Sequence, residues 1–159
     1  MAKLGVRKAT ANDVALILKF IKKLAEYENM LDQVVADESL LKEWIFDKNK
    51  AEVLFATKDG VEVGFALYFH NFSTFLGRAG IYLEDLFVLE EYRGQGLGKL
   101  LLKTLANITV ERGCGRLEWS CLDWNKPSID FYHSLGAKKL DEWKAFRLTG
   151  KELERLAKE

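Results

Sequence analysis

The feature that most constrains this chain is a glycine-rich turn between an apolar, strand-like run and a helix-like run. The turn is residues 92–99, Tyr-Arg-Gly-Gln-Gly-Leu-Gly-Lys, between the strand-like run 81–89 and the helix-like run 97–112. Three glycines at alternate positions leave the backbone N–H groups open to an oxygen-rich ligand. Because the first turn of a helix also has unpaired donors and a positive dipole end, the pattern predicts an anion site, most often for phosphate.

The spacing of these glycines narrows the kind of phosphate site. A Walker loop reads G-x-x-x-x-G-K-S/T, and this turn contains no such sequence. A dinucleotide-binding fingerprint reads G-x-G-x-x-G and would place its third glycine one residue later than Gly98. The alternative is a glycine-rich turn that caps an ordinary helix, and a motif this short leaves both interpretations open.

The composition is that of a globular protein. With 159 residues, 48% of them hydrophobic and 30% charged, the chain is long enough for one domain with an adequate core. The formal net charge is zero, so we expect no bulk attraction to nucleic acid. No apolar run approaches the ~20 residues that span a bilayer, and the N-terminal residues contain no signal-peptide core. We therefore expect a cytoplasmic protein that does not bind membranes.

The cysteines and histidines argue against a metal site. Cys114 and Cys121 do not form a C-x-x-C pair, and the only histidines are His70 and His133. These residues lack the spacing of a zinc site, so we expect no metal. Both cysteines are expected to be free thiols in a reducing compartment.

Hydrophobic periodicity and turn residues predict a single α/β domain over residues 1–159. Strands are expected over residues 4–8, 52–57, 61–70, 81–88, 116–122 and 143–148. Helices are expected over 10–28, 38–46 and 97–112, from Pro127 to Gly136, and after a capping box at Thr149–Glu152.

Two finer expectations follow from local patterns. Asp59-Gly60 predicts a hairpin turn, and residues 71–80 are expected to form a loop. In the second helix, four residues are expected to face inward: Leu40, Leu41, Trp44 and Ile45.

The glycine turn and the order of elements together resemble one family. The sequence Arg93-x-x-Gly96-x-Gly98 is similar to the R/Q-x-x-G-x-G/A signature by which the GCN5-related N-acetyltransferases (GNAT) bind the diphosphate of coenzyme A. The predicted order β-α-α-β-β-β-α-β-α-β is also that of the family, so the resemblance covers essentially the whole chain. It implies the α/β GNAT fold, a mixed, twisted central β-sheet flanked by helices, and it implies acetyl-CoA as co-substrate.

Three further segments resemble the diamine acetyltransferase branch, which includes the spermidine/spermine enzymes and their thialysine-acetylating relatives. They are 22–28 (Lys-Lys-Leu-Ala-Glu-Tyr-Glu), 82–88 (Tyr-Leu-Glu-Asp-Leu-Phe-Val) and 123–132 (Asp-Trp-Asn-Lys-Pro-Ser-Ile-Asp-Phe-Tyr). The resemblance implies a homodimer that acetylates a primary amine of a polyamine, a diamine or a thialysine-like amino acid, by direct attack in a ternary complex. The chain departs from the eukaryotic spermine enzymes in its shorter 57–61 hairpin and in Phe75, where those relatives often have tryptophan.

Acetyl transfer requires a proton acceptor, because a lysine-type amine has a pKa of about 10.4 and must lose a proton before it attacks a thioester. The resemblance gives this role to Glu84, which would also bind the amine. From the residues alone, a solvent-facing or salt-bridged glutamate is the alternative. In a regular strand Glu84 and Asp85 point to opposite faces, so only one of them is expected to reach the site.

The departing thiolate requires a proton donor, and the resemblance gives this role to Tyr132. Ser128 and Tyr132 are four apart on one predicted helix and share a face. The alternative is a tyrosine packed on the sheet beside Phe131 and Leu135. His133 points about a quarter-turn away and is interpreted as a surface histidine.

The resemblance also implies the binding residues. Tyr27 and Glu28 match acceptor positions at the end of the first helix, and Glu84 completes them. The pantetheine arm is expected to pair with the main chain of three strand residues: Leu86, Phe87 and Val88. The other residues expected to bind the cofactor are Arg93, Gly94, Gln95, Gly96, Leu97, Gly98, Lys99, Asn125 and Ser128.

Two other functions compete with acetylation of a small amine. Acetylation of a protein lysine or N-terminus predicts activity on peptides and none on diamines. A non-catalytic module that binds acetyl-CoA predicts tight binding without thiol release. The presence of both Glu84 and Tyr132 argues against such a module.

Overall fold

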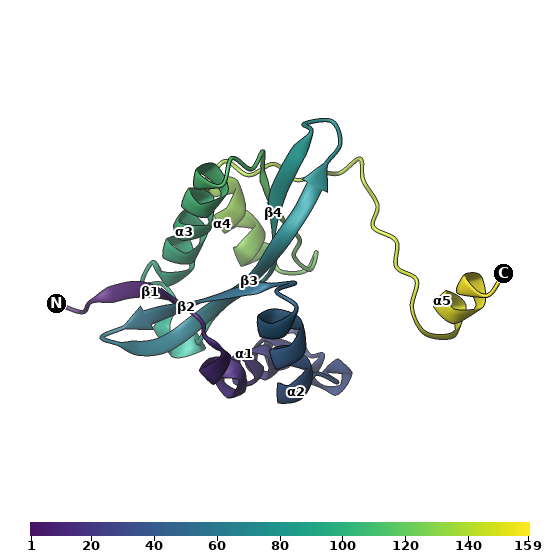
Figure 1. The fold of residues 1–159 in the computed structure, drawn as a ribbon. Coiled ribbons are helices and arrows are strands. Elements are labelled where there is room, and N and C mark those ends of the chain that lie inside the picture. The colour runs from purple at the N-terminus through teal and green to yellow at the C-terminus, as the bar shows by residue number, and fades with distance from the viewer. The chain divides into compact units, whose positions relative to one another are not determined.

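The computed structural model describes residues 1–159, which form two compact units, Met1–Ser120 and Cys121–Glu159. The first unit contains a five-stranded sheet in the order β1-β2-β3-β4-β5 (Figure 1). The strands are β1 (Leu4–Lys8), β2 (Glu52–Lys58), β3 (Val61–Ser73), β4 (Arg78–Val88) and β5 (Leu117–Trp119). The pairs from β1 to β4 are antiparallel and β5 runs parallel to β4, so the sheet is mixed, as expected.

Helices cover both faces of this sheet within the first unit. The helices α1 (Val14–Tyr27) and α2 (Glu38–Leu41) lie on one face, and α3 (Leu97–Glu111) lies on the other (Figure 1). The strand β2 shows why both faces of the sheet must be covered by helices. Its residues Val53 to Ala56 are all buried, although successive side chains of a strand point to opposite faces.

The core on the α1 face is aromatic. The Phe20 ring stacks on Phe65 with centroids 5.5 Å apart, in a cluster that includes Phe55 and Phe87. On the other face, α3 buries a stripe of leucines against the strands: Leu97, Leu101, Leu102 and Leu105. Each fully buried side chain of this size contributes about 1.5–3 kcal/mol, which fixes the start of α3, and with it the glycine turn, on the sheet.

Three local expectations in the first unit differ from the structure. The second helix changes into a π-helical turn at Lys42–Asp47, which shifts the apolar spacing off a single face. Ile45 is therefore buried, as expected, but Leu40 and Trp44 are exposed. The expected 71–80 loop is shorter, because β3 and β4 continue to pair as far as Ser73 and Arg78.

The second unit contains α4 (Lys126–Ser134) and α5 (Gly150–Ala157). The helix α4 is capped by Asn125, has Pro127 in its first turn, and ends before Gly136, whose φ of 89° favours glycine. The capping box expected at Thr149 does not form, since the Thr149 side chain makes no cap hydrogen bond.

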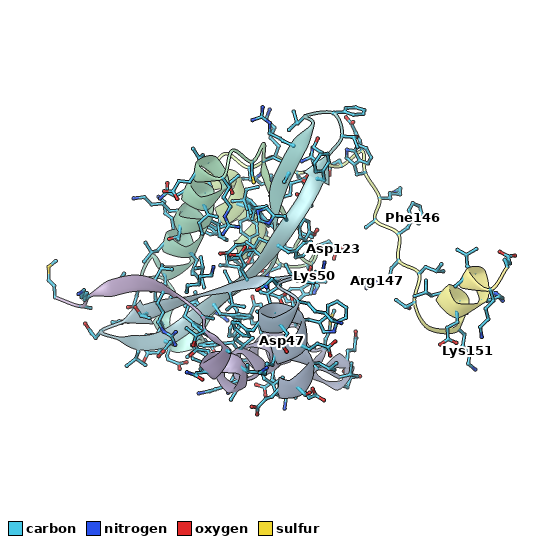
Figure 2. The ribbon with its side chains drawn as sticks, viewed as in Figure 1. Asp47, Lys50, Asp123, Phe146, Arg147 and Lys151 are labelled. Atoms are coloured by element: carbon cyan, nitrogen blue, oxygen red, sulfur yellow. The ribbon has the colours of Figure 1, made fainter.

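The last strand expected from the sequence, over 143–148, is absent. A strand requires a neighbour that pairs with its N–H and C=O groups, and the second unit offers none. Phe146 lies in this segment, between α4 and α5, and is 94% exposed (Figure 2). No helix in either unit has the length and hydropathy needed to cross a bilayer.

Candidate active site

The glycine-rich turn has the conformation that an anion site requires. Gly94 and Gly96 have φ values of 76° and 86°, in the left-handed region that side chains disfavour. A Cβ atom added at Gly94, Gly96 or Gly98 would meet no other atom within 4 Å, so the space in front of the backbone is open. Leu100 N donates to Gly96 O at 2.9 Å, and the N–H groups before it lie at the open end of α3. This turn fits a phosphate-bearing ligand.

The strand that leads into the turn carries a β-bulge at Glu84. Leu67 of β3 pairs with Asp85, whereas the next residue, Tyr68, pairs with Leu83, so Glu84 has no partner opposite. A bulge re-aims the side chains around it. The expectation that Glu84 and Asp85 alternate between two faces applies to a regular strand, and β4 is not regular at this point.

Three carboxylates interact electrostatically at this bulge. Asp85 is partly buried, and its side chain interacts electrostatically with both Glu84 and Glu28. Burial, together with these two charges, raises the pKa of Asp85 to about 7. Burial also raises the pKa of Glu28. We call Glu28, Glu84 and Asp85 the carboxylate cluster, and a cationic amine beside it would lower its electrostatic repulsion.

The end of α1 brings the two expected acceptor residues to β4. The helix ends after Tyr27, where Glu28 N donates to Leu24 O at 3.0 Å and Asn29 takes a φ of 58°. The Tyr27 ring lies 6.3 Å from the Phe87 ring, centroid to centroid. The structure therefore brings Tyr27 and Glu28 together with the strand before the glycine turn.

Arg93 connects this group to the turn. Its Nε donates to Val88 O at 2.9 Å. Its guanidinium carbon lies 4.6 Å from the centroid of the Tyr27 ring and 5.2 Å from that of Phe87. The sequence predicted Arg93 as a cofactor residue and missed these contacts, because they join segments far apart in the chain.

Two further residues interact with the expected site residues and were not anticipated from the sequence. Asp85 interacts electrostatically with Glu84 and Glu28. Lys58, at the end of β2, donates from Nζ to Gln95 Oε1 at 2.7 Å and so contacts the glycine turn. Nothing in the local sequence of Lys58 signals this contact.

The remaining expected site residues lie in the second unit, on or beside α4. Asn125 Oδ1 caps the helix by accepting from Ser128 N at 3.4 Å. Ser128 and Tyr132 lie on α4 one turn apart, and the Tyr132 ring is 5.7 Å from that of Phe131. No group of three or more His, Cys, Asp or Glu side chains is arranged to hold a metal ion.

The mixed sheet, its helices and the open turn after β4 define an α/β protein whose turn fits a phosphate-bearing ligand. Residues 19–137 match the model of the Acetyltransferase (GNAT) family, and the chain belongs to this family. It is an acetyl-transferring enzyme, and acetyl-CoA is the acetyl donor that GNAT enzymes use.

Individual relatives agree with this family. The chain is 40% identical to the thialysine N-epsilon-acetyltransferase of Sus scrofa, over 99% of both chains. It is 32% identical to the L-ornithine N5-acetyltransferase of Arabidopsis thaliana, over 96% of this chain and 87% of that one. An integron cassette protein of V. cholerae, a solved structure, superposes with a TM-score of 0.81 at 29% identity, over 98% of both chains. The expected fold, family and diamine and thialysine-like branch are confirmed.

Proposed function

We propose that this enzyme transfers the acetyl group of acetyl-CoA to a primary amine of a small molecule, with a thialysine-like amino acid or a diamine as acceptor. Its relatives include enzymes named for thialysine and for L-ornithine, and both compounds carry a primary amine on a side chain. The observation that carries the proposal is the carboxylate cluster that follows Tyr27, since carboxylates that raise one another's pKa favour a cationic amine. Polyamines, which carry several ammonium groups, are further candidate acceptors.

The cofactor would lie along β4 and the glycine turn. Its diphosphate would accept hydrogen bonds from the N–H groups of residues 94–99, and Arg93 would lie beside it. Its pantetheine arm would follow the main chain of Leu86–Val88, and Asn125 and Ser128 would complete the binding residues. The bound acetyl-CoA supplies the activated thioester that the amine attacks.

The proposed chemistry needs one proton acceptor and one proton donor. Glu84 accepts a proton from the ammonium group of the acceptor, through water, so that the nitrogen becomes neutral. The neutral nitrogen forms a bond to the acetyl carbon while the bond from that carbon to sulfur breaks. Tyr132 donates its hydroxyl proton to the departing sulfur, and the second proton, which the nitrogen releases as it becomes an amide, restores the Tyr132 hydroxyl. We propose that neither Cys114 nor Cys121 carries an acetyl group; Cys114 is partly buried and Cys121 is exposed, so the expectation that both thiols pack in the core is wrong for Cys121.

We also propose that the enzyme is a cytoplasmic homodimer in which both units belong to one acetyltransferase domain. The family match runs from residue 19 to 137, across the junction between the units.

The 143–148 segment exposes large apolar side chains, Trp143 by 76% and Phe146 by 94%, which is typical of a contact surface. Cys114 and Cys121 are free thiols, as in a reducing compartment. Light scattering should give twice the chain mass of 18.2 kDa.

A substrate panel tests the proposed function. Thiol release from acetyl-CoA is measured with thialysine, L-ornithine, a short diamine, spermidine and a lysine-containing peptide. Release should be fastest with one of the small amines. Release with the peptide alone would instead identify a protein acetyltransferase, and binding of acetyl-CoA without any release would identify a non-catalytic module.

A further inference from the structure

We propose that Lys58 is a cofactor-binding residue of this enzyme, whose ammonium group holds the diphosphate of acetyl-CoA at the glycine turn. The inference rests on the proposed use of that turn for acetyl-CoA. It adds a cation from the β2–β3 hairpin to a site that the sequence signature builds from residues 93–99 alone.

The fold places Lys58 at the turn. Lys58 is the last residue of β2 and pairs with Val61 of β3 across a two-residue hairpin turn. Both residues of that turn, Asp59 and Gly60, have positive φ values of 51° and 81°, as a tight hairpin requires. Because the hairpin is so short, the Lys58 side chain stays at the end of the strand, and its Nζ reaches Gln95 Oε1 at 2.7 Å.

The contact joins Lys58 to the part of the turn that is open to a ligand. Gln95 lies between Gly94 and Gly96, the two residues held in the left-handed conformation. An ammonium group has three donors, and Gln95 accepts from one of them. The Lys58 Nζ also lies 5.7 Å from the centroid of the Tyr92 ring, which helps to hold it in place.

The charge of Lys58 is not neutralised by the protein. Other lysines of the first unit form ion pairs, such as Lys8 with Glu52 at 3.1 Å, but no carboxylate pairs with Lys58. A positive group bonded to a side chain of the open turn, with donors to spare, matches the chemistry of a diphosphate. Because Gln95 holds the side chain in position beforehand, less conformational entropy is lost when the anion binds.

Arg93, the other basic side chain of the turn that makes tertiary contacts, is held from outside the turn. It donates to Val88 O and lies over the rings of Tyr27 and Phe87. Lys58 is thus the basic residue whose head group is bonded to a side chain within the turn itself.

The test compares Lys58→Gln with Lys19→Gln, which removes the same charge from an exposed position on α1. Calorimetry with the full-length protein gives the dissociation constant of coenzyme A for each variant. Lys58→Gln should raise it about tenfold, the loss expected for one charge-assisted hydrogen bond, and Lys19→Gln should leave it unchanged. The difference in dissociation constant between Lys58→Gln and the wild type should shrink at high salt, because Lys58 is only partly buried. Thermal unfolding confirms that both variants fold as the wild type does.

A second ligand shows which phosphate group of coenzyme A Lys58 contacts. The same titrations with 3′-dephospho-coenzyme A should show the same tenfold penalty, because that ligand keeps the diphosphate. An unchanged constant in Lys58→Gln, or a penalty that disappears with the dephospho ligand, would overturn the inference. Failure of the proposed cofactor site looks different, since the wild-type protein would then bind neither ligand, and failure of the proposed acceptor appears only in the substrate panel.

Discussion

The guanidinium carbon of Arg93 lies 4.6 Å from the centroid of the Tyr27 ring, so the last residue of α1 packs on the turn that follows β4. The same side chain donates to Val88 O at 2.9 Å. One residue therefore holds a proposed acceptor residue against the strand proposed for pantetheine. A change at Arg93 should therefore affect the binding of both the acceptor and acetyl-CoA.

Substitutions of Arg93 separate the contribution of its charge from that of its contact with the Tyr27 ring. Arg93→Met removes the charge and the ring contact, whereas Arg93→Lys keeps a charge but loses the planar group that stacks on Tyr27. Both variants should raise the KM for the acceptor by the equivalent of about 0.5–2 kcal/mol, the range for a cation over an aromatic ring. The dissociation constant of acetyl-CoA should rise mainly in Arg93→Met. An acceptor KM that stays at the wild-type value in both variants would contradict the coupling of Arg93 to Tyr27.

Substitution by alanine should have opposite effects on stability at two glycines of the turn. Gly96 has a φ of 86°, so Gly96→Ala places a side chain in a strained conformation and should lower stability by about 1–2 kcal/mol. Gly98 lies in the first turn of α3 without a positive φ, and a Cβ there meets no atom within 4 Å. Gly98→Ala should therefore stabilise the protein by about 0.5–1 kcal/mol. Thermal unfolding of the two variants gives the comparison, and equal shifts would show that backbone conformation does not distinguish these positions.

Much of the fold could be predicted from the sequence because it depends on neighbouring residues. The turn at Asp59-Gly60, the amphipathic α1 and the glycine turn each follow from a pattern within a few residues, and all three form as expected. The family resemblance then predicted how the strands are arranged in one sheet. Residues 143–148 show the limit of such patterns, since apolar side chains favour a strand but do not supply the partner that it needs.

The parts of the site that the sequence missed depend on pairing between distant segments. The bulge at Glu84 arises from the register between β3 and β4, which no local pattern records. That bulge is why β4 is not regular at Glu84 and Asp85. The contact between Lys58 and Gln95 joins residues 37 apart in the chain, and it exists only because the sheet brings β2 to the turn.

Asp85 should make stability depend on pH. Burial and the charges of Glu84 and Glu28 raise its pKa to about 7 in the folded protein, whereas an unfolded aspartate has a pKa of about 3.9. Between these two values the unfolded chain has lost the proton that the folded protein still holds. The folded state then binds more protons, so the contribution of Asp85 to the free energy of unfolding falls as pH rises through this window and is constant above it.

The variant Asp85→Asn tests this linkage, because asparagine has a similar shape and does not titrate. The stability of Asp85→Asn relative to wild type should increase as pH rises from about 4 to about 7 and should then level off. Urea unfolding at several pH values gives the difference directly, and contributions from groups shared by both proteins cancel. A difference that is the same at every pH would show that Asp85 titrates normally in the folded protein.

Tyr132→Phe tests the proposed proton donor. The change removes only the hydroxyl group and keeps a ring of the same size on α4, next to Phe131 at 5.7 Å between centroids, so the helix should remain intact. Loss of a general acid should lower kcat by about 10²–10⁴-fold while the dissociation constant of acetyl-CoA stays unchanged. His133→Gln, at the exposed neighbouring position, is the matched control and should keep its turnover. If Tyr132→Phe turns over at the wild-type rate with its fold intact, the departing thiolate takes its proton from another group, and Tyr132 has only a packing role.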